Sequence, residues 1–269
     1  VGGIASLPKG ALGLVNHEVG HSLAGLHDEY DYEPGQNPDK QPPPSRDDIV
    51  ATRAAPPNLM HGSNKQEVEE RVLWRDWIEA EDRWWNGSQV GLFEGGDRKP
   101  FHVWRPQVSC MMRDNSGFCV VCMEHMVKVI YSRVRPIDRV DPEPGDLMLE
   151  KSTEDEVILK VWTLQPRTHD LEVTWHVLSF GLQRPDQAGD SSSGGTVVVD
   201  NRPGEPWRRA QSGTDPTGRT VQAAQIRAKD LEPGWHRVRC AVKDPTRWVL
   251  RDDQGLLQQQ LEWWVEVRP

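Results

Sequence analysis

The chain has 269 residues, which is long enough for two domains of ordinary size, and its 36% hydrophobic and 27% charged residues are typical of a globular protein. Its formal net charge of −9 argues against nucleic acid as the main partner, because a polyanion is bound by clustered Lys and Arg. No apolar stretch of the sequence approaches the length that crosses a bilayer, so we expect no membrane insertion.

The first predicted helix covers residues 10–25, where apolar residues recur at near-helical spacing after a short predicted strand and turn at 1–8. This spacing places His17 and His21 one turn apart on the same helix face. Together with Glu18 they form the pattern His-Glu-x-x-His. Average composition produces this pattern by chance in roughly one chain in a hundred of this length, so coincidence is the alternative to a functional site.

The pattern predicts a catalytic zinc site. Two imidazoles at positions i and i+4 of a helix can bind one Zn²⁺ ion, and Glu18 can serve as general base on the attacking water without being a ligand. A structural metal site would explain the two histidines but not the glutamate beside the first. Gly25 follows the second histidine and can adopt a positive φ, which would turn the chain and return a third ligand to the metal.

The following segments alternate between irregular and regular patterns. Residues 33–57 are rich in Pro, Asp, Asn and Gln and predict a surface loop. Helical patterns return at 66–85 and at 120–133, and the Gly-rich, aromatic stretch 91–105 is strand-like or irregular.

A hinge is expected at residues 136–145, which combine three prolines with acidic residues. Downstream the pattern changes to period two, which is typical of strands separated by short turns. This change predicts an antiparallel β-sandwich of immunoglobulin or fibronectin type at 146–269. The strand candidates are residues 157–162, 171–177, 196–199, 221–226, 235–242 and 261–267.

Four blocks of residues 1–135 resemble the IgA peptidase-like family of zinc metallopeptidases, which is of metzincin type. The blocks are the motif His-Glu-x-Gly-His…Gly-Leu-x-Asp-Glu-Tyr at 17–30 and the segments 91–95, 104–106 and 110–113. The resemblance implies an α+β chain with a partial metzincin-like catalytic domain at 1–135, whose N-terminal part we expect to precede Val1. It also implies Zn²⁺ as cofactor, and it places Met112 in the Met-containing turn beneath the metal.

Two residues compete as the third zinc ligand. The usual metzincin interval from His21 reaches His27, but it leaves Ala24 where metzincins place Gly. The same three-residue step taken from Gly25 reaches Asp28, which matches the Asp-Glu-Tyr of the family motif. We therefore predict Asp28 as third ligand, with His27 as the alternative.

Three cysteines of the first domain form a second pattern. Cys119 and Cys122 are a Cys-x-x-Cys pair that begins nine residues after Cys110 and is followed by His125. Three thiolates and an imidazole could bind a structural zinc ion. A disulfide from Cys110 to Cys119 or Cys122 is the alternative, and free buried thiols are the third possibility.

Two functions follow from these features. The first is a secreted or cell-surface zinc endopeptidase that hydrolyses protein or peptide substrates. The second is a non-catalytic binding or adhesion protein with a vestigial zinc site and a functional β-sandwich. Both histidines, Glu18 and the candidate Met turn favour the endopeptidase.

Overall fold

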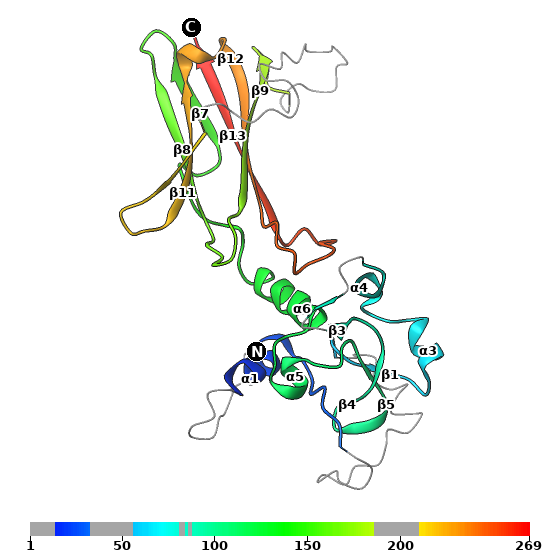
Figure 1. Ribbon diagram of the computed structural model, residues 1–269. Coiled ribbons are helices and arrows are strands. Elements are labelled where there is room, and N and C mark those ends of the chain that lie inside the picture. The colour runs from blue at the N-terminus through cyan, green and yellow to red at the C-terminus, as the bar shows by residue number, and fades with distance from the viewer. Residues whose placement is uncertain (1–13, 33–55, 81–83, 86–87, 186–209) are drawn as a thin grey trace. The chain divides into compact units, whose positions relative to one another are not determined.

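The computed structural model describes residues 14–32, 56–80, 84–85, 88–185 and 210–269, which belong to two compact units (Figure 1). One unit comprises Val1–Ile130 and Arg247–Arg251, and the other comprises Tyr131–Thr246 and Asp252–Pro269. The strands predicted at 1–8 and 196–199 and most of the loop at 33–57 lie outside the described residues. No helix among the described residues has the length and apolar character that crossing a membrane requires.

The first unit combines short helices with small antiparallel sheets. The strands β1, β5 and β4 form one sheet in that order, and β2 pairs with β3. Its elements are α1 (Val15–Ala24), β1 (Met60–His61), α3 (Lys65–Glu69), α4 (Arg75–Glu79), β2 (Trp84–Trp85), β3 (Ser88–Gln89), β4 (Phe93–Gly96), β5 (Lys99–Arg105), α5 (Met111–Asp114) and α6 (Val120–Tyr131).

The single helix predicted at 66–85 is wrong, because the structure has two short helices there, α3 and α4. The side chains of Val68 and Trp74 are both buried in the same core. Six residues of a continuous helix would separate them by roughly 120° around its axis. The break between α3 and α4 therefore allows both residues to face the core.

The second unit contains two four-stranded sheets, with strand orders β10-β11-β8-β6 and β7-β13-β12-β9. All strand pairs in these sheets are antiparallel except β7 and β13, which run parallel. The prediction of a wholly antiparallel sandwich is therefore wrong for the edge strand β7. The strands are β6 (Ile137–Asp141), β7 (Asp146–Glu150), β8 (Glu156–Thr163), β9 (Glu172–Gly181), β10 (Ala210–Thr214), β11 (Thr220–Arg227), β12 (Gly234–Lys243) and β13 (Gln258–Arg268), with a 3₁₀ turn at Ala228–Asp230.

One hydrophobic core is shared by the two sheets, which makes the unit a β-sandwich. Leu159 of β8 and Ile226 of β11 enter it from one sheet, and Val238 of β12 enters it from the other. Trp175 and Trp263 stack in this core with 5.8 Å between ring centroids. The strand orders are compatible with the immunoglobulin type, whose sheets have the orders ABED and CFG.

Part of the segment predicted to be a hinge is a strand. Within residues 136–145, β6 pairs with β8 at the edge of its sheet, and Ile137 is buried in the sandwich core. The backbone N–H of Ile137 donates to the side-chain oxygen of Gln259. Pro136 and Pro142 flank β6 without interrupting it, which is a position that proline tolerates in an edge strand.

Candidate metal centre

The helix α1 positions the two histidines of the motif. His17 is buried, and its ring centroid lies 4.8 Å from that of His21. The Nδ1 atom of His17 lies 2.9 Å from the carbonyl oxygen of Met111, and Nδ1 of His21 lies 2.6 Å from that of Leu26. A carbonyl oxygen can only accept a hydrogen bond, so each Nδ1 donates and, in the neutral ring, each Nε2 carries a lone pair.

A glycine turn returns the chain to these histidines. Gly25 follows α1 with φ 63° and ψ 27°, and its N–H donates to the carbonyl oxygen of His21. The N–H of Leu26 donates to the carbonyl oxygen of Gly20, which completes the capping turn. Three residues after Gly25, the Oδ1 atom of Asp28 lies 3.1 Å from both histidine Nε2 atoms.

Three electron-pair donors therefore meet at one point. The Nε2 atoms of His17 and His21 are 3.1 Å apart, and Asp28 Oδ1 is equally close to each. Such atoms repel one another unless a proton or a cation lies between them. Tetrahedral zinc with bonds of ~2.0–2.1 Å separates its ligand atoms by roughly 3.3 Å, so this donor set fits the ion.

The charges at this point favour a cation. Burial opposes ionisation of Asp28, but hydrogen bonds from His21 and Tyr30 outweigh it and lower the pKa of Asp28 to about 2. The hydrogen bond to Asp28 is also the main cause that raises the pKa of His21, and the negative charge of Glu18 adds to this effect. Asp28 is thus a carboxylate at neutral pH, as a metal ligand must be.

His27 does not take part in this convergence. Its side chain is 52% exposed, and its Nδ1 lies 3.9 Å from Oδ1 of Asp97. His27 lines a cavity of about 440 Å³ together with His21, Gly25, Leu26, Asp28, Asp97 and Arg98. The structure therefore brings Asp28, and not His27, to the histidine pair.

The segment that contains the candidate Met turn lies directly against α1. Met112 is fully buried, and a Cβ atom on Gly20 would lie 2.6 Å from its sulfur atom. The carbonyl oxygen of Met112 accepts a hydrogen bond of 2.7 Å from the N–H of Glu29. Met111 and Met112 thus contact both the motif helix and the returning chain.

The sequence pattern missed three residues that hold this returning chain. Asn58 is buried and binds both the N–H and the carbonyl oxygen of His27 through its side chain. The backbone N–H groups of Asp97 and Arg98 donate to the carbonyl oxygens of Asp28 and Tyr30. The positive φ angles of Asp97 and Arg98, 50° and 63°, shape this contact, and nothing in their residue types predicts it.

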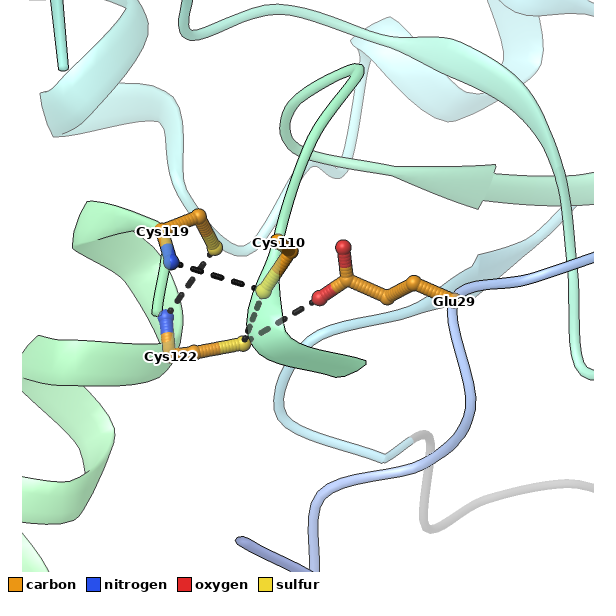
Figure 2. Close-up of side chains that lie close together, drawn as sticks. All are labelled: Glu29, Cys110, Cys119 and Cys122. Atoms are coloured by element: carbon orange, nitrogen blue, oxygen red, sulfur yellow. Dashed lines mark hydrogen bonds between the residues drawn. The ribbon is translucent and has the colours of Figure 1, made fainter. Parts of the chain in front are cut away.

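The three cysteines of the second pattern also come together, but with a different fourth residue. Cys110, Cys119 and Cys122 are free buried thiols that lie together beside the carboxylate of Glu29, as Figure 2 shows. The expected partner His125 is directed elsewhere, because its Nε2 bonds the carbonyl oxygen of Ala24 at 2.9 Å. The expected disulfide is not formed in the structure.

Comparison with sequence families gives a match in the first unit. A search of curated proteins found no similar sequence. Residues 45–130 match the sequence model of the family IgA Peptidase M64. This segment contains α3 to α6, with Met112 and the three cysteines, and it begins after the histidine motif of α1. Residues 45–130, about a third of the chain, are thus similar to an IgA peptidase-like family of metallopeptidases.

Proposed function

We propose that the chain is a zinc-dependent endopeptidase in which His17, His21 and Asp28 bind the metal and Glu18 is the general base. The convergence of two Nε2 atoms and one carboxylate oxygen within 3.1 Å of one another carries this proposal. The similarity of residues 45–130 to a peptidase family supports hydrolysis of peptide bonds in protein or peptide substrates.

The backbone of the first unit prepares the two imidazoles for binding. Hydrogen bonds from Nδ1 to the carbonyl oxygens of Met111 and Leu26 select the tautomer that leaves Nε2 free for the metal. Such bonds also fix the orientation of each ring and make Nε2 more basic. Asp28 adds one negative charge, and Arg98 lies 3.4 Å from its second oxygen, Oδ2.

Glu18 performs the proton transfers in this proposal. A zinc ion bound at the three ligands would polarise the scissile carbonyl and lower the pKa of the attacking water. The carboxylate of Glu18, one residue after the first ligand, would accept a proton from the attacking water and deliver it to the leaving amine. Glu18 is partly exposed on α1.

A metzincin-type architecture is part of the proposal. The left-handed Gly25 turn and the packing of Met112 beneath α1 support it. The third ligand departs from the type, because metzincins use a histidine where this chain would use the carboxylate of Asp28. An oxygen ligand at ~2.0–2.2 Å is equally compatible with catalytic zinc.

Substitution of Glu18 tests the proposed function. Glu18→Gln should reduce cleavage of a peptide library by at least about a hundredfold, because general base catalysis contributes this much, while the zinc content of α1 stays unchanged. Glu69→Gln, which changes an exposed glutamate of α3, serves as matched control and should keep full activity. Undiminished cleavage by Glu18→Gln would contradict the assigned role. Absence of cleavage by wild-type protein with bound zinc would favour the binding or adhesion protein instead.

A further inference from the structure

A second group of potential metal ligands lies apart from the proposed catalytic centre. It comprises Glu29 after α1, Cys110 before α5, and Cys119 and Cys122 at the start of α6, which we call the Cys/Glu cluster (Figure 2). All four residues have 0% exposure. One donor atom from each lies within 4.8 Å of the other three. Residues distant in sequence thus converge on a single enclosed point.

The carboxylate of Glu29 is incompletely satisfied in this enclosed position. Its Oε1 atom accepts from Asn58 Nδ2 at 3.0 Å and from Cys122 Sγ at 3.1 Å. Its Oε2 atom is buried and has no hydrogen-bond partner among the described residues. A buried carboxylate oxygen without a hydrogen-bond partner is costly. A cation at this point would remove the cost.

The distance between two of the three sulfur atoms corresponds to that around one tetrahedral ion. Cys110 Sγ and Cys122 Sγ lie 3.7 Å apart, and zinc bonds to sulfur of ~2.3 Å would separate two thiolates by roughly 3.8 Å. A disulfide would require about 2.0 Å between the same atoms. The N–H of Cys119 points to Cys110 Sγ at 3.4 Å, and the N–H of Cys122 points to Cys119 Sγ at 3.5 Å. Such donors stabilise thiolates.

Two arginines offset part of the negative charge that three thiolates and a carboxylate would leave around a divalent ion. Arg113 donates to the backbone carbonyl of Glu29 at 2.8 Å and to Asp31 at 2.7 Å. Arg105 is buried, and although burial lowers its pKa, the negative charges of Asp31 and Glu29 act in the opposite direction. The surroundings of the Cys/Glu cluster therefore supply positive charge next to it.

We propose that Glu29, Cys110, Cys119 and Cys122 bind a second zinc ion with a structural role. Zinc suits a tetrahedral set of thiolates and one carboxylate, and four protein ligands in a closed site leave no position for a water or substrate. Glu29 adjoins Asp28, and Cys110 adjoins Met111, whose carbonyl oxygen holds His17. The second ion would thus fix the backbone behind the catalytic centre to α6.

Zinc counting on the full chain tests this proposal. Wild-type protein purified under reducing conditions should contain two zinc ions per chain, and the double variant His17→Ala/His21→Ala should retain one. X-ray absorption of the retained ion should show sulfur neighbours at ~2.3 Å. Cys240→Ser, which changes a buried free thiol of the second unit, is the matched control and should leave both ions in place.

Substitutions within the Cys/Glu cluster separate ligation from packing. Glu29→His keeps four ligands of similar reach and should retain the second ion, whereas Glu29→Gln should lower its affinity more than tenfold in competition with a chelator. Titration of wild-type protein with an organomercurial needs no variant, and it should release one zinc as three thiols react.

Three results would overturn the proposal. They are a double histidine variant without zinc, a retained ion with only nitrogen and oxygen neighbours, and an unreduced wild-type mass lower by two hydrogens, which would indicate a disulfide. Equal zinc content in wild type and double variant, with sulfur neighbours, would instead contradict the proposed catalytic site and leave the second site standing. The failures of the two proposals are therefore distinguishable.

Discussion

The glycine at the end of α1 offers a sharp test of how the third donor reaches the histidines. Gly25 has φ 63° and ψ 27°, and no heavy atom lies within 4 Å of the position that a Cβ atom would occupy. Gly25→Ala therefore introduces no clash with neighbouring residues. Its whole effect comes from the left-handed backbone, which glycine adopts freely and alanine does not.

The magnitude follows from this conformation alone. A residue with a Cβ atom in the left-handed region costs roughly 1–2 kcal/mol, so local opening of the turn should become about 5–30 times more frequent. Gly25→Asn should cost less, because asparagine enters this region more readily than other residues. Gly213→Ala is a matched control, since Gly213 is also free of neighbours but lies in β10 without a positive φ.

Hydrogen exchange of the metal-free protein measures this opening directly. Amides of peptides from residues 14–32 should exchange about 5–30 times faster in Gly25→Ala, with a smaller change in Gly25→Asn and none in Gly213→Ala. Zinc should also be lost more readily to a chelator, because the opened turn removes Asp28 from the histidines. Unchanged exchange in Gly25→Ala, or equal effects of Ala and Asn at this position, would refute the reasoning.

Three further predictions concern single side chains. Asp28→Ala should release the zinc of the histidine pair and His27→Ala should retain it, as measured by zinc analysis; the reverse result would show that His27 is the ligand. Asn58→Ala should lower the free energy of unfolding by about 1–3 kcal/mol, because it removes the hydrogen bonds to the backbone of His27 and to the buried carboxylate of Glu29; an unchanged midpoint in a denaturant titration would contradict this. Trp263→Ala should lower the free energy of unfolding of the sandwich by about 3–5 kcal/mol, because it removes a fully buried side chain from the core. A melting temperature equal to that of the wild type would contradict this prediction.

Local patterns were sufficient for the elements whose side chains alternate or repeat regularly. The spacing around His17 and His21 predicts the helix that becomes α1, although its start at residue 10 lies outside the described residues. The alternation of buried and half-buried residues in β12 is almost perfect, and the sequence predicts this strand to within a few residues. In these segments the regular spacing of residues that prefer to be buried is enough to predict the secondary structure.

Tertiary contacts decided the segments that the sequence did not predict. Val68 and Trp74 share one core at the expense of a continuous helix, and Ile137 enters the sandwich from a segment whose prolines indicated a hinge. The fourth member of the Cys/Glu cluster could not be found by spacing either. His125 follows the cysteines closely, but Glu29 reaches them from a part of the chain that is remote in sequence.

The pair Asp28 and Glu29 links the two proposed metal sites through one peptide unit. Successive side chains of an extended segment point to opposite sides, so Asp28 can face the histidines while Glu29 faces the cysteines. Hydrogen bonds hold this unit on both sides, from the N–H of Glu29 to Met112 and from the N–H of Asp97 to the carbonyl oxygen of Asp28. A displacement of this peptide unit would therefore shift both side chains. The acidic dipeptide of the motif thus needs both of its residues, one for each side of the chain.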